Sequence, residues 1–332
     1  MKVRLRRMKR MGRSFIYFSL MFCLMAFANT NSYGQKKEFP EKAIKIIIQT
    51  TAGGVADLWA RAWSDDLSKL LKVPVMIQNE GGASAMAALI SAASANPDGY
   101  TLNGMSHSMV VGFAISSKPP VDLFKDFVSI GGFGYFPQLI AVENSSPFRT
   151  FEDLIDYAKK NPGKLKCGSA GVTMISHFSF EVVKQYAKVD IVMVPFKAAP
   201  ETGAALLGKH VDLVTLPPQS LLGFLKAGRV RALLTTGRLK DYPNVPLFAE
   251  KGLKEAGMNA WLGLAAPSGI PREAREKLAD AFEKVARDPK IMARIEALSF
   301  TPEYQNAADY LVTLKKDYEI IKEVAKKAGI SQ

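Results

Sequence analysis

Short apolar segments alternate with helix-like segments along most of the chain, and this alternation restricts the fold more than any other feature. Residues 44–48 (IKIII), 164–168 (KLKCG) and 211–216 (VDLVTL) are typical of buried strands, and each is followed by a segment with helical apolar spacing. Strands that alternate with helices build a mostly parallel sheet with helices on both faces. We therefore predict an α/β protein with a mainly helical tail from residue 272.

The first residues carry the pattern of an export signal. Residues 1–13 hold seven Lys or Arg, and residues 15–28 (FIYFSLMFCLMAFA) follow without a charge. The apolar stretch is short for a membrane span, and its last three residues include the small side chains that a signal peptidase recognises. We predict a signal peptide over residues 1–28, with cleavage as late as residue 34 as the alternative, and a periplasmic location.

The remaining composition limits the class of partner. Without residues 1–28 the formal charge falls from +13 to +6, because that segment carries seven basic and no acidic residues. A mild positive charge favours anionic ligands, and the lack of a basic stripe interleaved with aromatics argues against nucleic acid. Cys167 is then the one cysteine left, so no intramolecular disulfide can form. About 300 residues suggest two domains.

The first apolar strand runs into a glycine pair before a helix begins. Residues 44–48 are followed by Gln49 and then TTAGG, and the helical pattern begins near Asp57. Ligands of open α/β sheets sit at the carboxyl ends of strands, where helix N-termini offer unpaired N–H groups to anions. The alternative is a tight turn at Gly53-Gly54 with Asp57 as helix N-cap, and a surface ion pair between Asp57 and Arg61.

A second strand, loop and helix repeat this layout. Residues 164–168 lead into a loop from Ser169 to Ser176 that is rich in Gly, Ser and Thr, and a helix follows near His177. Two such loops that face each other would bring N–H groups and hydroxyls to one anion. Ordinary turn chemistry is the alternative for this loop.

An ordered series of short motifs resembles one family of receptors. The series consists of GG-x-x-D-x-x-A-R at 53–61, P-D-G-Y-T-L at 97–102, K-D-F at 125–127, N-P-G-K-L at 161–165, G-S-x-G at 168–171 followed by His177, V-P-F-K at 194–197, V-D-L at 211–213 and W-x-G-L-x-A-P-x-G-x-P at 261–271. In this order and spacing, the chain resembles the substrate-binding proteins of tripartite tricarboxylate transporters, the Bug receptors. The resemblance runs from about Phe39 to the C-terminal helix.

The resemblance implies a type II-like periplasmic binding protein with two α/β domains, mixed and mostly parallel sheets, and a ligand cleft between the domains. It implies a small organic carboxylate as ligand and the membrane subunits of a tripartite transporter as partner. We expect a monomer without cofactor or metal. The chain is expected to cross between domains near 131–137 and near 228–230. Domain 1 would then comprise 36–136 with 232–332, and domain 2 would comprise 137–231.

The candidate ligand-binding residues come from the two loops and from neighbouring strand ends. They are Thr50, Thr51, Ala52, Gly53, Gly54, Val55, Ala56, Asp57, Ser84, Ser106, His107, Ser169, Ala170, Gly171, Val172, Thr173, Met174, Phe196 and Leu216.

Several of these positions depart from the family pattern toward apolar residues. Val55 follows the glycine pair where the family often has Ser or Thr, Met174 and Ile175 stand in the second loop, and Leu216 replaces a frequent Asp. We therefore hypothesise a ligand with one carboxylate and an apolar or aromatic body rather than a citrate-like tricarboxylate, because the buried hydroxyls of citrate would lack partners. The alternative is that Met174 and Ile175 only pack beneath the loop.

The histidines and one lysine leave their roles open. Ser106 and His107 follow the strand at 100–105 on its carboxyl side, so either can touch the ligand, and a histidine that caps a loop is an equal alternative. We expect His177 to fix the loop at 168–176. Lys197 either pairs with a ligand carboxylate or is a solvated surface lysine.

Two other functions compete with a transport receptor. An enzyme is the first, since two-domain folds also serve catalysts, but the chain has three histidines and lacks H-E-x-x-H, G-x-S-x-G and the Gly-rich phosphate motifs. We predict no enzymatic activity. The second presents the bound ligand to a two-component sensor instead of a transporter, and neighbouring genes would distinguish these two outputs.

Overall fold

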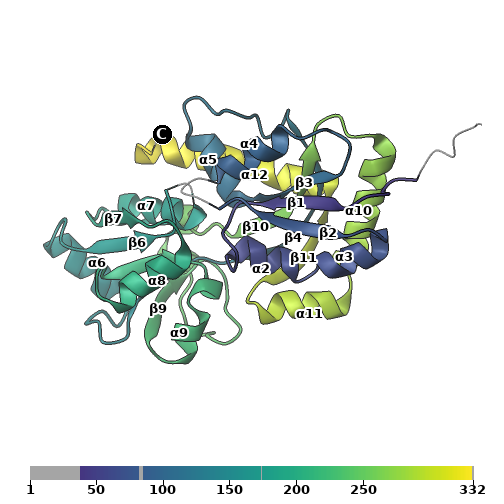
Figure 1. Ribbon diagram of the computed structural model, residues 1–332. Helices are drawn as coiled ribbons and strands as arrows, with labels where there is room; N and C mark the ends of the chain where they lie inside the picture. The colour runs from purple at the N-terminus through teal and green to yellow at the C-terminus, as the bar shows by residue number, and fades with distance from the viewer. Residues whose placement is uncertain (1–37, 82–84, 173, 331–332) are drawn as a thin grey trace, which may run out of the picture. The chain divides into compact units, whose positions relative to one another are not determined.

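The computed structural model describes residues 38–81, 85–172 and 174–330 of the 332-residue chain (Figure 1). The chain separates into a short N-terminal unit, residues 1–41, and a main unit, residues 42–332, which holds every helix and strand described below. The predicted signal peptide lies outside the described residues. Within those residues, no helix is both long enough and apolar enough to cross a membrane.

The first sheet has six strands in the order β11-β4-β10-β3-β1-β2. They are β1 (Ile44–Ile48), β2 (Val75–Asn79), β3 (Thr101–Ser106), β4 (Phe127–Phe136), β10 (Ala260–Pro267) and β11 (Thr301–Asn306). β1 pairs in parallel with β2 and β3, whereas β10 runs antiparallel to β3 and β4, and β11 antiparallel to β4. Leu262 pairs with Ser106, so β10 brings a distant part of the sequence to the carboxyl end of β3.

Helices cover both faces of this sheet. They are α2 (Val55–Arg61), α3 (Ser64–Leu71), α4 (Met86–Ala93), α5 (His107–Ile115), α10 (Arg272–Ala286), α11 (Pro289–Ala297) and α12 (Ala307–Ala328). α4, α5 and α12 lie together on one face (Figure 1). On the other face, the ring of Trp63 lies 4.9 Å from Trp59 and 5.2 Å from Phe282, between centroids, so α2, α3 and α10 share an aromatic core.

The second sheet has five strands in the order β7-β6-β8-β5-β9. Its strands are β5 (Leu139–Glu143), β6 (Lys166–Ser169), β7 (Val192–Pro195), β8 (Leu213–Leu216) and β9 (Val230–Thr235). Its helices are α6 (Phe151–Lys160), α7 (Ile175–Ala187), α8 (Ala199–Leu207) and α9 (Leu222–Lys226). Short turns of 3₁₀ helix lie before α9, at η1 (Pro218–Ser220), and after β9, at η2 (Phe248–Lys251) and η3 (Lys254–Ala256). β6 is parallel to β7 and β8, and β5 is antiparallel to β8 and β9. Leu206 of α8 and Leu225 of α9 pack in one core cluster with Val214 of β8.

The predicted α/β class, with two mixed sheets and helices on both faces, is confirmed. Antiparallel pairing takes a larger share than expected, because β4, β5, β9, β10 and β11 all join their sheets in that direction. The chain passes from the first sheet to the second between Phe136 and Leu139. It leaves the second sheet after Thr235, not near residues 228–230, because β9 belongs to that sheet. The predicted domain limits stay a prediction.

Two elements beside the site, β4 and α5, escaped the sequence analysis for physical reasons. β4 contains Gly131, Gly132 and Gly134, which resemble a flexible crossing. A Cβ on Gly132 would come 2.6 Å from the ring of Tyr310, so glycine is needed there for close packing inside a strand. α5 is buried along all of its length except Ala114, so it shows no polar face from which a helix could be recognised.

Candidate ligand-binding site

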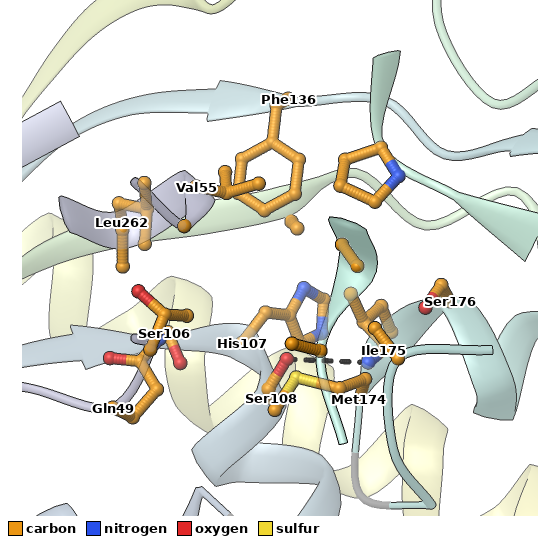
Figure 2. Close-up of a pocket in the computed structure, with 18 of the residues that line it drawn as sticks. Gln49, Val55, Ser106, His107, Ser108, Phe136, Met174, Ile175, Ser176 and Leu262 are labelled. Carbon is orange, nitrogen blue, oxygen red and sulfur yellow. Dashed lines mark hydrogen bonds between the residues drawn. The ribbon is translucent and has the colours of Figure 1, made fainter. Parts of the chain in front are cut away.

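A cavity of about 80 Å³ lies at the carboxyl ends of β1 and β3 (Figure 2). One buried water needs roughly 10–15 Å³ on this measure, so the cavity has room for several waters or a small organic molecule. Its polar lining residues are Gln49, Thr50, Thr51, Ser106, His107, Ser108, Gln138, Ser176 and Lys197. Its other lining residues are Gly54, Val55, Ala56, Phe136, Ala170, Met174, Ile175, Ala198, Ala199, Pro200, Pro217, Ala260, Trp261 and Leu262.

Four helices begin at the wall of this cavity. The N-cap residues of α2, α5, α7 and α8 are Gly54, Ser106, Met174 and Ala198, and all four line it. None of them makes a side-chain capping hydrogen bond. The first N–H groups of a helix have no partner within the helix, and its N-terminus carries a partial positive charge. Ile175 N of α7 already donates to Ser108 Oγ, and Pro200 of α8 has no N–H. The other first-turn N–H groups and the four positive helix ends suit an anion.

The charges of the lining agree with this. No Asp or Glu lines the cavity among the residues that the structure describes, and Lys197 is the one Lys or Arg in that lining. An acidic side chain here would repel an anion and would occupy the free helix N–H groups. The arrangement thus favours a negatively charged group on the ligand.

Asp57 fixes the loop between β1 and α2 and lies outside the cavity lining. Its carboxylate accepts hydrogen bonds from Gly53 N at 2.9 Å, Arg61 Nε at 2.8 Å and Asn79 Nδ2 at 2.9 Å. Asn79 Nδ2 also donates to the carbonyl of Thr50 at 3.0 Å. The expected Asp57–Arg61 ion pair is confirmed, although the Asp57 side chain is only 3% exposed. Asp57 is the third residue of α2, not its N-cap.

These partners also set the ionisation of Asp57. Burial by itself would raise the pKa of the carboxyl, but the hydrogen bonds from Arg61, Gly53 and Asn79 outweigh it and hold the pKa below its ordinary value. Asp57 is therefore ionised at neutral pH and satisfied by protein groups. Its role is to shape the loop that presents Thr50, Thr51 and Gly54 to the cavity.

The second loop is fixed from behind by a histidine, as we expected. Ser169 Oγ and His177 Nδ1 are 2.7 Å apart, and Ser169 is fully buried. Burial, opposed in part by Glu181, lowers the pKa of His177, so the ring is neutral at pH 7. Ser169 is therefore engaged with His177 and does not line the cavity. The loop is also tied to α5, because Ile175 N donates to Ser108 Oγ at 3.3 Å (Figure 2).

His107 lies in the cavity wall and is oriented by the carbonyl group of Asn259. Its Nδ1 is 2.8 Å from the carbonyl oxygen of Asn259, so Nδ1 carries the hydrogen, because a carbonyl only accepts. Its Nε2 is 3.7 Å from Asp317 Oδ2 on α12. Burial raises the pKa of Asp317, and the nearby His107 and Lys316 oppose this only in part.

Replacing Asp317 with asparagine should raise the stability of the protein at pH 8 by about 1 kcal/mol, because a poorly paired buried charge is removed. The folded protein holds a proton on Asp317 more tightly than the unfolded chain does, so the free energy of unfolding falls as pH rises through the raised pKa. The gain should therefore shrink toward pH 4. Urea unfolding of both proteins at the two pH values measures it, and an equal gain at both would contradict this account.

The structure brings about half of the predicted site residues together. Those that line the cavity are Thr50, Thr51, Gly54, Val55, Ala56, Ser106, His107, Ala170 and Met174. The other described ones, Ala52, Gly53, Asp57, Ser169, Gly171, Val172, Phe196 and Leu216, lie outside its lining. Leu216 is fully buried in the core of the second sheet, and Phe196 packs against that core. Ser84 and Thr173 lie outside the described residues, and ligand contact by any of the set stays a prediction.

Most of the lining residues that the sequence did not suggest come from places without a local signal. Phe136 and Gln138 stand where the chain passes between the sheets, and Ala260 and Leu262 arrive on β10. Ala260 pairs with Phe136, and Leu262 pairs with Ser106. These residues reach the cavity through pairing of strands that are far apart in the sequence, which local sequence patterns do not reveal. Gln49 had a usable signal, because it directly follows a predicted strand.

The protein has two mixed sheets, the chain passes from one to the other and back, and residues from both parts line a cavity that suits an anion. This is the architecture of a periplasmic binding protein. Within that class, the chain belongs to the tripartite tricarboxylate transporter receptors, because residues 59–330 match the family described as "Tripartite tricarboxylate transporter family receptor". The predicted family is thereby confirmed.

Individual relatives agree with this assignment. A Cupriavidus necator protein described as "UPF0065 protein in gbd 5'region" is 31% identical over 299 residues, which are 87% of this chain and 90% of that protein. The structure of the periplasmic binding protein BugD is 26% identical, with a TM-score of 0.82 over 88% of this chain and 99% of BugD. The structure of R. palustris Rpa4515 with adipate shares the fold, with 24% identity and a TM-score of 0.83 over 89% of this chain and 99% of that one.

Proposed function

We propose that this receptor is exported to the periplasm and captures a small organic carboxylate in the cavity at the ends of β1 and β3. The convergence of four helix N-termini, none with a side-chain cap, on a cavity whose described lining holds no acidic residue carries the proposal. Backbone N–H groups and a partial positive charge at several helix ends stabilise an anion without a dedicated arginine. Lys197 adds positive charge to the lining.

The rest of the lining favours a ligand with an apolar part. Met174 and Ile175 line the cavity, and Phe136, Trp261 and Leu262 line it as well. Apolar lining contributes affinity through the area that a ligand removes from water, about 25 cal/mol per Å². We infer one carboxylate and a compact aliphatic or aromatic body. Lys197 is the one basic residue of the described lining, so a second or third buried carboxylate would have no charge partner there.

Delivery of the ligand to a tripartite transporter is the output that family membership supports. Presentation to a two-component sensor is the second candidate, and it uses the same binding site. Deletion of the gene separates them. Loss of uptake of the bound carboxylate supports delivery, and loss of ligand-dependent transcription with normal uptake supports signalling.

Binding is tested on residues 35–332 by thermal unfolding in the presence of carboxylates and their amides. Adipate, which Rpa4515 holds in its structure, is one probe, and linear and aromatic monocarboxylates are the others. A ligand at about a hundred times its dissociation constant adds roughly 2.7 kcal/mol to stability. A shift with a carboxylate and none with its amide supports the proposal. No shift with any carboxylate, using protein refolded to remove carried-over ligand, would overturn it.

A further inference from the structure

Four buried oxygen atoms in the described part of the cavity lining have no hydrogen-bond partner. They are Oε1 of Gln49, Oε1 of Gln138, Oγ of Ser106 and Oγ1 of Thr50, and the ring atom Nε2 of His107 is unpartnered as well. Gln49, Gln138 and Ser106 are 3%, 1% and 3% exposed, respectively. Buried polar groups in native proteins are normally satisfied, because leaving one without a partner is costly. Several in one lining indicate partners that arrive with a ligand.

Two of these residues lie at the carboxyl ends of neighbouring strands, where a ligand can reach them. Gln49 directly follows β1 and Ser106 ends β3, and these strands are paired neighbours. Figure 2 shows the two side chains next to each other on one side of the cavity, with Met174 and Ile175 on another. Leu262 pairs with Ser106, so a ligand that contacts these two oxygens also meets apolar side chains.

The chemistry of the unpartnered atoms specifies what is missing. An amide oxygen only accepts hydrogen bonds. The amide of Gln138 is held in one orientation, because its Nε2 donates to the carbonyl of Pro137 at 3.2 Å. A carboxylate also only accepts, so it can occupy the helix N-termini but cannot satisfy Gln49 or Gln138. The missing partners are therefore donors.

The charge of the lining separates the possible donors. An ammonium group donates hydrogen bonds but would be a buried cation, and no Asp or Glu lines the cavity among the described residues. An unpaired buried charge is far more costly than a neutral polar group. A hydroxyl or an amide N–H brings a donor without that cost.

We propose that Gln49 and Gln138, with Ser106, select a carboxylate that carries a neutral hydrogen-bond donor, such as a hydroxycarboxylate, over the unsubstituted and the amino-substituted acid. This inference rests on the proposed function and specifies its ligand further. It also revises the expectation that polar substituents lack partners here. The proposed ligand keeps its apolar body and carries one neutral hydrogen-bond donor in addition to the carboxylate.

The test is a matched ligand series measured by titration calorimetry on residues 35–332. The series is pentanoate, 2-hydroxypentanoate, 3-hydroxypentanoate and 2-aminopentanoate. One of the two hydroxy acids should bind at least 10-fold more tightly than pentanoate and than the amino acid, since a site that hydrogen-bonds a hydroxyl discriminates strongly against its absence. Equal affinity of pentanoate and both hydroxy acids would overturn the inference while leaving a carboxylate receptor in place. Absence of binding by every acid would overturn both proposals.

Substitutions test whether the preference for the hydroxy acid comes from the unpartnered side chains of the lining. Gln49→Leu should lose the preference for the hydroxy acid over pentanoate. Gln305→Leu is the matched control, because Gln305 Oε1 on β11 is also buried without a partner but does not line the cavity. It should keep the preference. If Gln49→Leu does not fold, Ser106→Ala provides the same comparison. A preference that survives in both Gln49→Leu and Ser106→Ala would contradict the assignment.

Discussion

Replacing Met174 with aspartate should weaken carboxylate binding at least 100-fold and leave the protein folded. Met174 is the N-cap of α7, has the extended backbone that an N-cap needs (φ −74°, ψ 142°), and lines the cavity. Aspartate is among the best N-cap residues, so its carboxylate would take the first N–H groups of the helix. Two unit charges about 5 Å apart repel by about 3 kcal/mol at an effective dielectric constant of 20, which is about 100-fold in affinity.

The stability of this variant should stay within about 1 kcal/mol of the wild type, because the gain from a capped helix offsets the lost contacts of the methionine. Met174→Asn is the matched control: it caps α7 with a neutral side chain, so it should weaken binding about 10-fold. Calorimetric titration with the best carboxylate from the ligand screen, and urea unfolding without ligand, measure the two effects. Equal affinities of the aspartate and asparagine variants would show that the charge of the ligand is not felt at this helix end.

The helix ends at the cavity show why only part of the site could be predicted. The loop from Thr50 to Ala56 was predicted because strand, glycines and helix follow one another in the sequence. Ala198 was not, because an N-cap without a polar side chain leaves no mark in the sequence. The proposed site depends on this lack of capping, since an Asp at this position would satisfy the N–H groups that the proposed anion would contact. What keeps the start of α8 open to an anion therefore also hides it in the sequence.

Long-range pairing explains the remaining differences. The alternation of strands and helices is a local pattern, so β1, β3 and β6 with their following loops could be predicted. Phe136 and Ala260 meet only because β4 and β10 pair across more than a hundred residues of sequence. Asp57 is the opposite case. Its place beside the glycines suggested ligand contact, but Asn79, on the neighbouring strand β2, completes a set of protein partners that the sequence did not reveal.

Replacing Gly54 with alanine should weaken carboxylate binding at least 10-fold and destabilise the protein by about 1–3 kcal/mol, the usual range for overpacking. The backbone of Gly54 (φ −73°) would accept alanine. A Cβ there, however, would lie 2.7 Å from Thr50 Cβ and 2.9 Å from the carbonyl oxygen of Thr51. The contact with a backbone atom cannot be relieved by a side-chain rotation. The loop that lines the cavity must therefore move, and both threonines with it.

Gly53→Ala is the matched comparison and should behave differently. Gly53 has φ +76°, which costs alanine about 1 kcal/mol, but no atom lies within 4 Å of the position of its Cβ. Its N–H can still donate to Asp57, so affinity should stay within about 3-fold of the wild type. Titration and urea unfolding of both variants test this, and equal losses of affinity would contradict it. The two adjacent glycines thus serve different needs: Gly53 provides the left-handed turn, and Gly54 provides the space in which Thr50 and Thr51 line the cavity.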